Sequence, residues 1–298
     1  MKKLLIGFIC CVLLLSTLTG CFAQSEIRTV TASFYPIYIL AMNVFDGIDG
    51  IELALMTAPE TGCLHDYQLN ARDMHKLANA DAFLVCGAGM EAYLPDVQQQ
   101  FPDLPVVDCS QGIDLLEEAE DEHEDEEHAY NAHTWLDAQN AATIVHTIAD
   151  AACQLFPEYT DQLRKNEAEY AERLLVLDEE LKEALQPVQG KKIVTFHEAF
   201  PYFARAYGLE IAAVISEEHE ETLSPSQLTA VIETVMAEGV PPLFTEPQYS
   251  ASAAYAVAAE TGAKIYELDP LVTGELDKDA YEAGMRANAQ ALLEAFGE

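Results

Sequence analysis

Short apolar and β-branched runs alternate along the chain with longer segments of helical periodicity. Eight runs are predicted to be strands, at residues 27–33, 51–56, 82–87, 105–109, 191–196, 209–215, 242–246 and 263–268. Helical patterns lie between them, at 36–46, 70–80, 90–100, 137–155, 198–207, 225–238, 250–261 and 279–296. Strands that alternate with helices predict parallel sheets built from βαβ units. Four strands, a break and four more strands predict an α/β protein of two lobes, 26–155 and 188–298, each with a four-stranded parallel sheet.

The break between the lobes has the pattern of one long helix over 157–187. Apolar residues recur there at helical spacing, at Leu163, Tyr170, Leu174, Leu177, Leu181 and Leu185. Pro157 suits the first turn and Pro187 ends the run. About 30 residues at about 1.5 Å rise would make a rod of roughly 45 Å, too long for a crossover within one lobe. We therefore expect a rigid backbone helix that joins the two lobes. Two shorter helices with a kink are the alternative, but the segment has no internal Gly or Pro.

The first residues have the pattern of a secretory signal peptide, 1–20. Lys2 and Lys3 precede a long apolar segment. The sequence Leu-Thr-Gly-Cys that ends at Cys21 resembles a bacterial lipobox, in which the cysteine is acylated. Acyl chains on Cys21 would hold a folded domain on a membrane surface. An ordinary signal peptide with a chance cysteine is the alternative.

Composition narrows the class of partner. Half of the 298 residues are hydrophobic, enough for a large core, and 51 acidic against 15 basic residues give a net charge of −36. Phosphate binding needs Lys and Arg patches, so nucleic acid is excluded as a partner. The charge also argues against electrostatic docking on anionic lipid and favours a protein that attracts cations.

The seven cysteines form no CxxC pair, so a zinc site made of thiolates is poorly supported. Cys86 and Cys109 both end predicted strands. The sequence allows two states for this pair: a disulfide between them, or two buried free thiols.

Three of the eight histidines lie at the ends of predicted strands. His65 lies in the loop after the second strand, His133 precedes a helix, and His197 ends the fifth strand. Ligands of open parallel sheets bind beyond the carboxyl ends of the strands. Asp269 and Glu246 lie at equivalent places, Asp269 as a fourth ligand and Glu246 as an alternative ligand or as the acceptor that orients an imidazole. Three imidazoles and a carboxylate suit Zn²⁺; sites for Mn²⁺ or Fe²⁺ are richer in carboxylate.

The remaining histidines have weaker arguments. His75 and His146 fall inside helical patterns, where packing or solvent explains them. His123 and His128 lie in the acidic loop 117–131. Its charge run predicts a solvated segment, and a low-affinity collector of zinc is the alternative.

Six motifs together resemble one known family. They are ASFYPIY, HDYQLNARDM, HTWLD, VTFHEAFPYFARAYGLE, FTEPQYS and YELDPL, in this order over nearly the whole mature chain. They are similar to the solute-binding lipoproteins of bacterial ABC importers for zinc and manganese, the ZnuA/TroA-like group. The resemblance implies two α/β lobes on a rigid helix, with His65, His133, His197 and Asp269 at the ligand positions. Retention of His197 and the acidic insert favour zinc. Leu64 departs from the members that carry a glutamate there, and Cys63 is interpreted as a packing residue rather than as a soft ligand.

We therefore expect a monomeric zinc-binding protein that delivers its ion to an ABC-type permease. A manganese- or iron-binding member of the same family is one alternative. A secreted zinc hydrolase with Glu198 as its base is another, although no HExxH pattern is present. A surface adhesin with a structural metal is a third.

Overall fold

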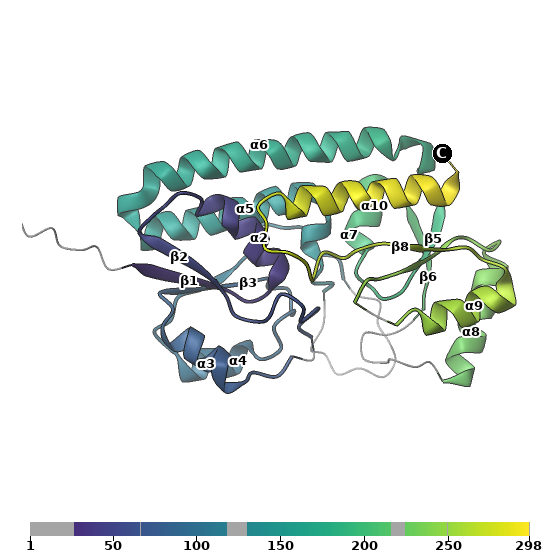
Figure 1. The fold of residues 1–298 in the computed structure, drawn as a ribbon, viewed down its shortest axis with the longest axis horizontal. Helices are drawn as coiled ribbons and strands as arrows, with labels where there is room; N and C mark the ends of the chain where they lie inside the picture. Colours follow the sequence, from purple (N-terminus) through teal and green to yellow (C-terminus); the bar gives the residue numbers. More distant parts are fainter. Residues whose placement is uncertain (1–26, 66, 118–129, 216–223, 249, 298) are drawn as a thin grey trace, which may run out of the picture.

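The computed structural model describes residues 27–65, 67–117, 130–215, 224–248 and 250–297, and they form two α/β lobes (Figure 1). Each lobe contains a parallel four-stranded sheet, ordered β2-β1-β3-β4 in the first and β6-β5-β7-β8 in the second. The predicted fold class is confirmed. The two sheets have the same topology, so the carboxyl ends of corresponding strands lie at equivalent edges.

The first lobe contains the strands β1 (Arg28–Ala32), β2 (Ile51–Leu55), β3 (Ala82–Val85) and β4 (Val106–Asp108). Its helices are α2 (Tyr35–Val44), α3 (Ala71–Ala78), α4 (Leu94–Gln100) and α5 (Ala138–Leu155). Every residue of β3 is buried, as expected of an inner strand covered on both faces. A capping box between Asn70 and Asp73 starts α3 and ends the long loop that follows β2.

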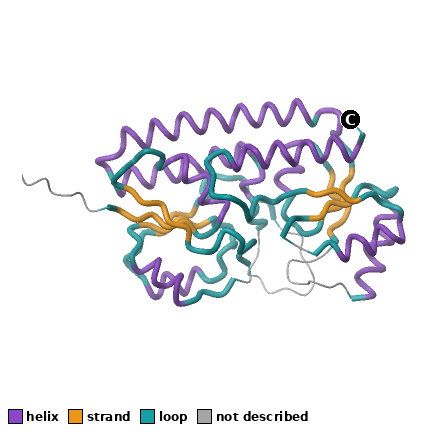
Figure 2. The backbone as a smooth tube through the Cα atoms, in the orientation of Figure 1, coloured by secondary structure: helices purple, strands orange, loops and turns teal. Residues whose placement is uncertain are grey.

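The second lobe contains β5 (Lys192–Thr195), β6 (Glu210–Val214), β7 (Leu243–Thr245) and β8 (Ile265–Glu267). Its helices are α7 (Pro201–Tyr207), α8 (Pro225–Ala237), α9 (Ser252–Thr261) and α10 (Ala280–Phe296). In both lobes the sheet lies between two layers of helices, with α3 and α4, or α8 and α9, on the side away from the long helix (Figure 2).

The long helix is α6 (Thr160–Ala184), 25 residues with a 3₁₀ turn at each end, Pro157–Tyr159 and Gln186–Val188. It runs along both lobes, and α10 lies beside it (Figure 1). The apolar positions found in the sequence are its buried face. Arg173 of α6 pairs with Glu282 of α10 at 2.5 Å, which adds an ionic contact between the two helices.

The core is continuous from one lobe to the other. One apolar cluster includes Val30 and Leu84 of the first sheet as well as Ile193 and Phe244 of the second. A smaller cluster, around Val235, packs only under the outer helices of the second lobe. The two lobes therefore share a core in addition to their connecting helix.

The structure also decides the state of Cys86 and Cys109. Cys86 and Cys109 are buried free thiols, and the Cys86 thiol donates to the carbonyl oxygen of Ala132. Within the described part of the chain, no helix is both long and apolar enough to cross a bilayer.

Candidate metal centre

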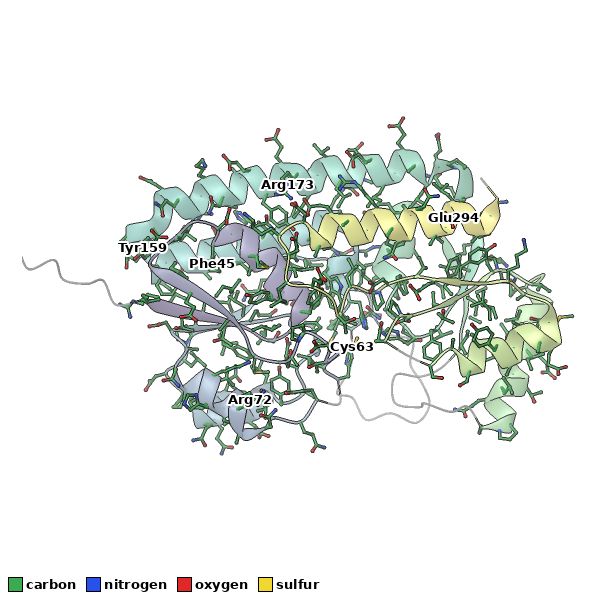
Figure 3. All side chains as sticks on the ribbon, viewed as in Figure 1. Phe45, Cys63, Arg72, Tyr159, Arg173 and Glu294 are labelled. Atoms are coloured by element: carbon green, nitrogen blue, oxygen red, sulfur yellow. The ribbon has the colours of Figure 1, made fainter. Side chains whose placement is uncertain are left out.

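The candidate site lies where loops from the two sheets meet. Cys63 and His65 come from the loop after β2, His133 from the segment after β4, and His197 from the loop after β5. Because all of these segments follow carboxyl ends of strands, two facing lobes bring them to one place. Figure 3 labels Cys63, which lies in the middle of the molecule between the lobes.

His133 is held by a short turn that also contacts the other lobe. Its backbone N–H donates to Asn131 Oδ1 at 3.1 Å. Asn131 donates through Nδ2 to the carbonyl oxygen of Glu198 at 2.7 Å, and the Tyr202 hydroxyl donates to the Asn131 carbonyl oxygen at 2.9 Å. Asn131 therefore ties the His133 turn of the first lobe to the His197 loop of the second. The sequence gives no signal for this role, because Asn131 lies in an irregular segment.

His197 is oriented by Glu246, which directly follows β7. Both side chains are buried, at 1% and 2% exposure, and His197 Nδ1 lies 2.5 Å from Glu246 Oε1. The same oxygen accepts the backbone N–H of His197 at 3.2 Å, and Glu246 Oε2 accepts from Gln248 Nε2 at 2.7 Å. A carboxylate only accepts, so Nδ1 carries the proton and Nε2 keeps its lone pair for a metal ion.

Three ligand atoms converge at the centre. Cys63 Sγ lies 3.5 Å from His133 Nε2 and 3.8 Å from His197 Nε2, and the three atoms lie within 4.8 Å of one another. Among the described residues, they form the one group of at least three His, Cys, Asp or Glu side chains that converges in this way. The sequence favours a packing role for Cys63, whereas the structure places its thiol beside two imidazoles. The sequence feature that could have indicated its place at the centre is its position two residues before His65.

His65 and Asp269 lie outside this group of three. The His65 ring is 5.6 Å from the His133 ring, so His65 adjoins the centre. Asp269 Oδ1 accepts the backbone N–H of Leu271 at 2.7 Å. Burial raises the pKa of Asp269, and the nearby Glu246 also raises it. The assignments of His65 and Asp269 as ligands remain predictions.

Burial sets the protonation state of the central imidazole. It lowers the pKa of His133 well below 6.5, and neighbouring His197 and His65 lower it further. The folded protein therefore favours the neutral ring, which is the form that binds a cation.

Several predicted sites lie outside the described residues. They are the lipidation site Cys21 and the loop histidines His123 and His128. The described histidines outside the centre lie on helices: His75 is exposed on α3, and His146 on α5 contacts Glu167 and Asp150.

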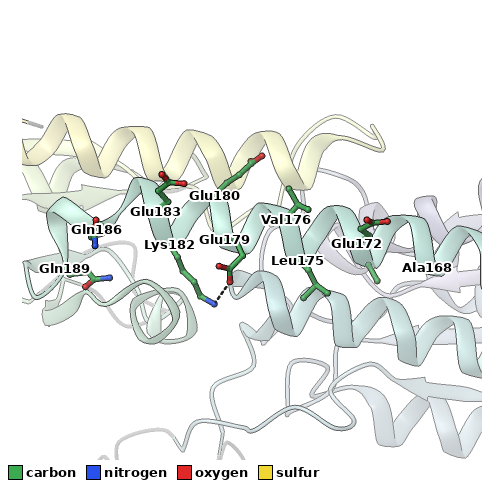
Figure 4. A pocket seen from close by; sticks show the side chains of 11 residues that line it. Ala168, Glu172, Leu175, Val176, Glu179, Glu180, Lys182, Glu183, Gln186 and Gln189 are labelled. Carbon is green, nitrogen blue, oxygen red and sulfur yellow. Dashed lines mark hydrogen bonds and ion pairs between the residues drawn. The ribbon is translucent and has the colours of Figure 1, made fainter.

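A surface groove lies elsewhere, along α6 (Figure 4). Leu175 and Val176 contribute its exposed apolar part. Its charged residues are Glu172, Glu179, Glu180, Lys182 and Glu183. No histidine or cysteine lines it, so the groove lacks the nitrogen and sulfur ligands that suit Zn²⁺.

The chain is similar to known proteins over most of its length. A family model described as the periplasmic component A of a zinc-uptake complex matches residues 30–295. The zinc-binding lipoprotein AdcA of Streptococcus pneumoniae serotype 4 is 29% identical over 307 residues, covering 98% of this chain and 60% of that protein. The chain spans only 56% to 60% of the length of such AdcA relatives.

Solved structures are similar over most of the chain. A crystal structure of ZnuA has a TM-score of 0.77 and 27% identity, covering 91% of this chain and 99% of that one. The laminin-binding protein Lmb of Streptococcus agalactiae, described as bifunctional with adhesin and metal-transporting activity, has a TM-score of 0.76 and 27% identity, with 90% and 99% covered.

Proposed function

Because the chain belongs to the family of periplasmic zinc-uptake components, whose model it matches over residues 30–295, we propose that it binds Zn²⁺ outside the cytoplasm and delivers it to an ABC-type permease. One observation carries this proposal: donor atoms from both lobes, on Cys63, His133 and His197, approach within 4.8 Å of one another. A site between lobes can take up an ion and release it when its loops shift. Capture and release require no chemistry on a substrate, so we propose a carrier and not a hydrolase.

His65, His133 and His197 are the proposed imidazole ligands, with Asp269 as the fourth ligand that the sequence predicts. Glu246 supports this set by fixing the ring of His197. Nitrogen-rich ligation suits Zn²⁺ better than Mn²⁺ or Fe²⁺, which take more carboxylate and water.

The location of the protein follows from the same proposal. A lipid on Cys21 would hold a monomer on the outer face of a membrane, near its permease. The acidic loop with His123 and His128 would collect zinc weakly before transfer to the central site. The S. pneumoniae relative named as a lipoprotein supports the anchor.

Competitive titration of the metal-free protein tests the function. We expect one tightly bound Zn²⁺ per chain, weaker binding of Mn²⁺, and a loss of zinc affinity of at least about 100-fold in His133→Ala, beyond the range for indirect partners. His75→Ala is the matched control, since His75 is exposed on α3. Unchanged zinc binding in His133→Ala would refute the site. Zinc-dependent cleavage of a chromogenic ester would instead indicate an enzyme.

A further inference from the structure

Resting on the proposed zinc-carrier function, the geometry points to Cys63, in place of the predicted Asp269, as the fourth ligand: a thiolate that completes the site with His65, His133 and His197 and selects thiophilic cations. Zinc lies about 2.3 Å from a thiolate and about 2.0–2.1 Å from an imidazole nitrogen in tetrahedral sites, which places sulfur and nitrogen about 3.6 Å apart. The observed Sγ–Nε2 distances are 3.5 Å to His133 and 3.8 Å to His197. The sulfur therefore lies at ligand spacing from both imidazoles.

The loop after β2 presents two donors to the same partner. Leu64 is fully buried in the core, and the residues on either side of it, Cys63 and His65, both contact His133. Gly62 precedes them with a φ of +83°, a left-handed conformation that favours glycine. A turn at Gly62 and an apolar anchor at Leu64 thus fix the direction in which the thiol points.

Among its described residues, the loop after β2 offers no carboxylate to the metal centre, and the Cys63 sulfur is the loop's source of negative charge. The Leu64 side chain packs in the core and has no donor atom to offer. Asp269 is engaged by the backbone N–H of Leu271 and does not join the group around His133 and His197. Cys63 supplies the negative charge from the adjacent position. When the S–Zn bond forms, the thiol proton leaves to solvent.

A sulfur ligand determines which metals the carrier takes. Soft thiolates favour Zn²⁺ and other thiophilic cations, whereas Mn²⁺ prefers oxygen ligands. Cys63 would therefore widen the preference for Zn²⁺ over Mn²⁺ beyond what three histidines give.

Substitution of Cys63 with Co²⁺ as a spectroscopic probe tests the assignment. We expect the Co²⁺-loaded full chain to show thiolate-to-cobalt charge-transfer absorption in the near ultraviolet. The Cys63→Ser variant should lose this absorption, while Cys153→Ser, which removes a half-buried thiol of α5, should retain it. Contributions from the other cysteines cancel in the difference between variants. We also expect Cys63→Ser to lower zinc affinity by at least about 100-fold and to narrow the Zn²⁺/Mn²⁺ preference.

The outcomes separate this inference from the proposed function. Stoichiometric zinc binding by the wild type, with identical cobalt spectra in wild type and Cys63→Ser, would overturn the thiolate ligand and leave the carrier intact. Failure of the wild type to bind zinc would overturn both. Circular dichroism of Cys63→Ser shows that any loss does not come from misfolding.

Discussion

Glu246 is the residue whose substitution tests the geometry of the centre without removing a ligand. It is buried and accepts three hydrogen bonds, from the ring and backbone of His197 and from Gln248. Replacing it with Gln keeps an oxygen for His197 but removes the negative charge. The new amide nitrogen faces Gln248 Nε2, so the Gln248 amide must turn over.

The size of the effect follows from these contacts. A hydrogen bond to a charged group contributes about 1.5–3 kcal/mol, against about 0.5–1.5 kcal/mol for a neutral one. Glu246→Gln therefore loses about 1.4 kcal/mol of support for the metal-binding ring, which corresponds to about tenfold weaker zinc binding. Glu246→Ala leaves the buried ring N–H and backbone N–H without this acceptor. We expect about 100-fold weaker binding and a less stable fold.

Zinc affinity is measured by competition with a chromophoric chelator, and stability by thermal unfolding of the metal-free protein. Glu267→Gln is the matched control, because Glu267 is exposed and pairs with Thr245, next to Glu246. It removes the same charge near the site without touching His197. Equal zinc affinities in the wild type and Glu246→Gln would refute the claim that Glu246 prepares His197 for metal.

Three further predictions concern the rest of the chain. Burial raises the pKa of Glu91 from 4.5 to about 7, so its contribution to stability is full below pH 4.5 and is lost as pH rises to about 7. This loss is at most about 3 kcal/mol. Glu91→Gln should flatten the dependence of the unfolding free energy on pH between pH 4.5 and about 7. Parallel curves for the wild type and the variant would contradict this. Deletion of residues 117–128 should leave one tight zinc site per chain, and loss of stoichiometric binding in a titration would show that the site is misplaced. Metal-free and zinc-loaded protein should give the same radius of gyration in solution scattering, whereas a compaction on zinc binding would indicate hinge closure.

The fold could be predicted from the sequence because its signals are local. Each β-branched run, such as the one that forms β5, is a strand within two residues of its expected ends. The spacing of Leu174, Leu177 and Leu181 identifies the buried face of α6. The ends of α6 were less predictable, since the turns at Pro157 and Gln186 are 3₁₀ and the sequence pattern continues through them.

The site was predictable only in part, because its contacts join distant segments. The approach of His133 to His197 could be predicted from their places after strands, which a parallel topology brings together. The sequence does not show which way a side chain points in an irregular loop, so Cys63 was assigned to packing. The bond from Asn131 to Glu198 spans the two lobes and leaves no pattern along the chain.

The shared core constrains how the proposed carrier can release its ion. The Trp135 indole N–H donates to the Pro270 carbonyl oxygen at 2.8 Å, and the Tyr281 hydroxyl donates to the Trp135 carbonyl oxygen at 2.7 Å, both buried between the lobes. Wide opening would break these bonds and expose apolar surface, at about 25 cal/mol per Å². The His133 and His197 side chains are buried, and hydrogen bonds hold the His133 backbone and the His197 ring, whereas Cys63 and His65 are only half-buried. Leu64 between them is anchored in the core, so we expect the Cys63 and His65 side chains to turn away from the ion while the core stays closed, and release to be a local movement rather than a separation of the lobes.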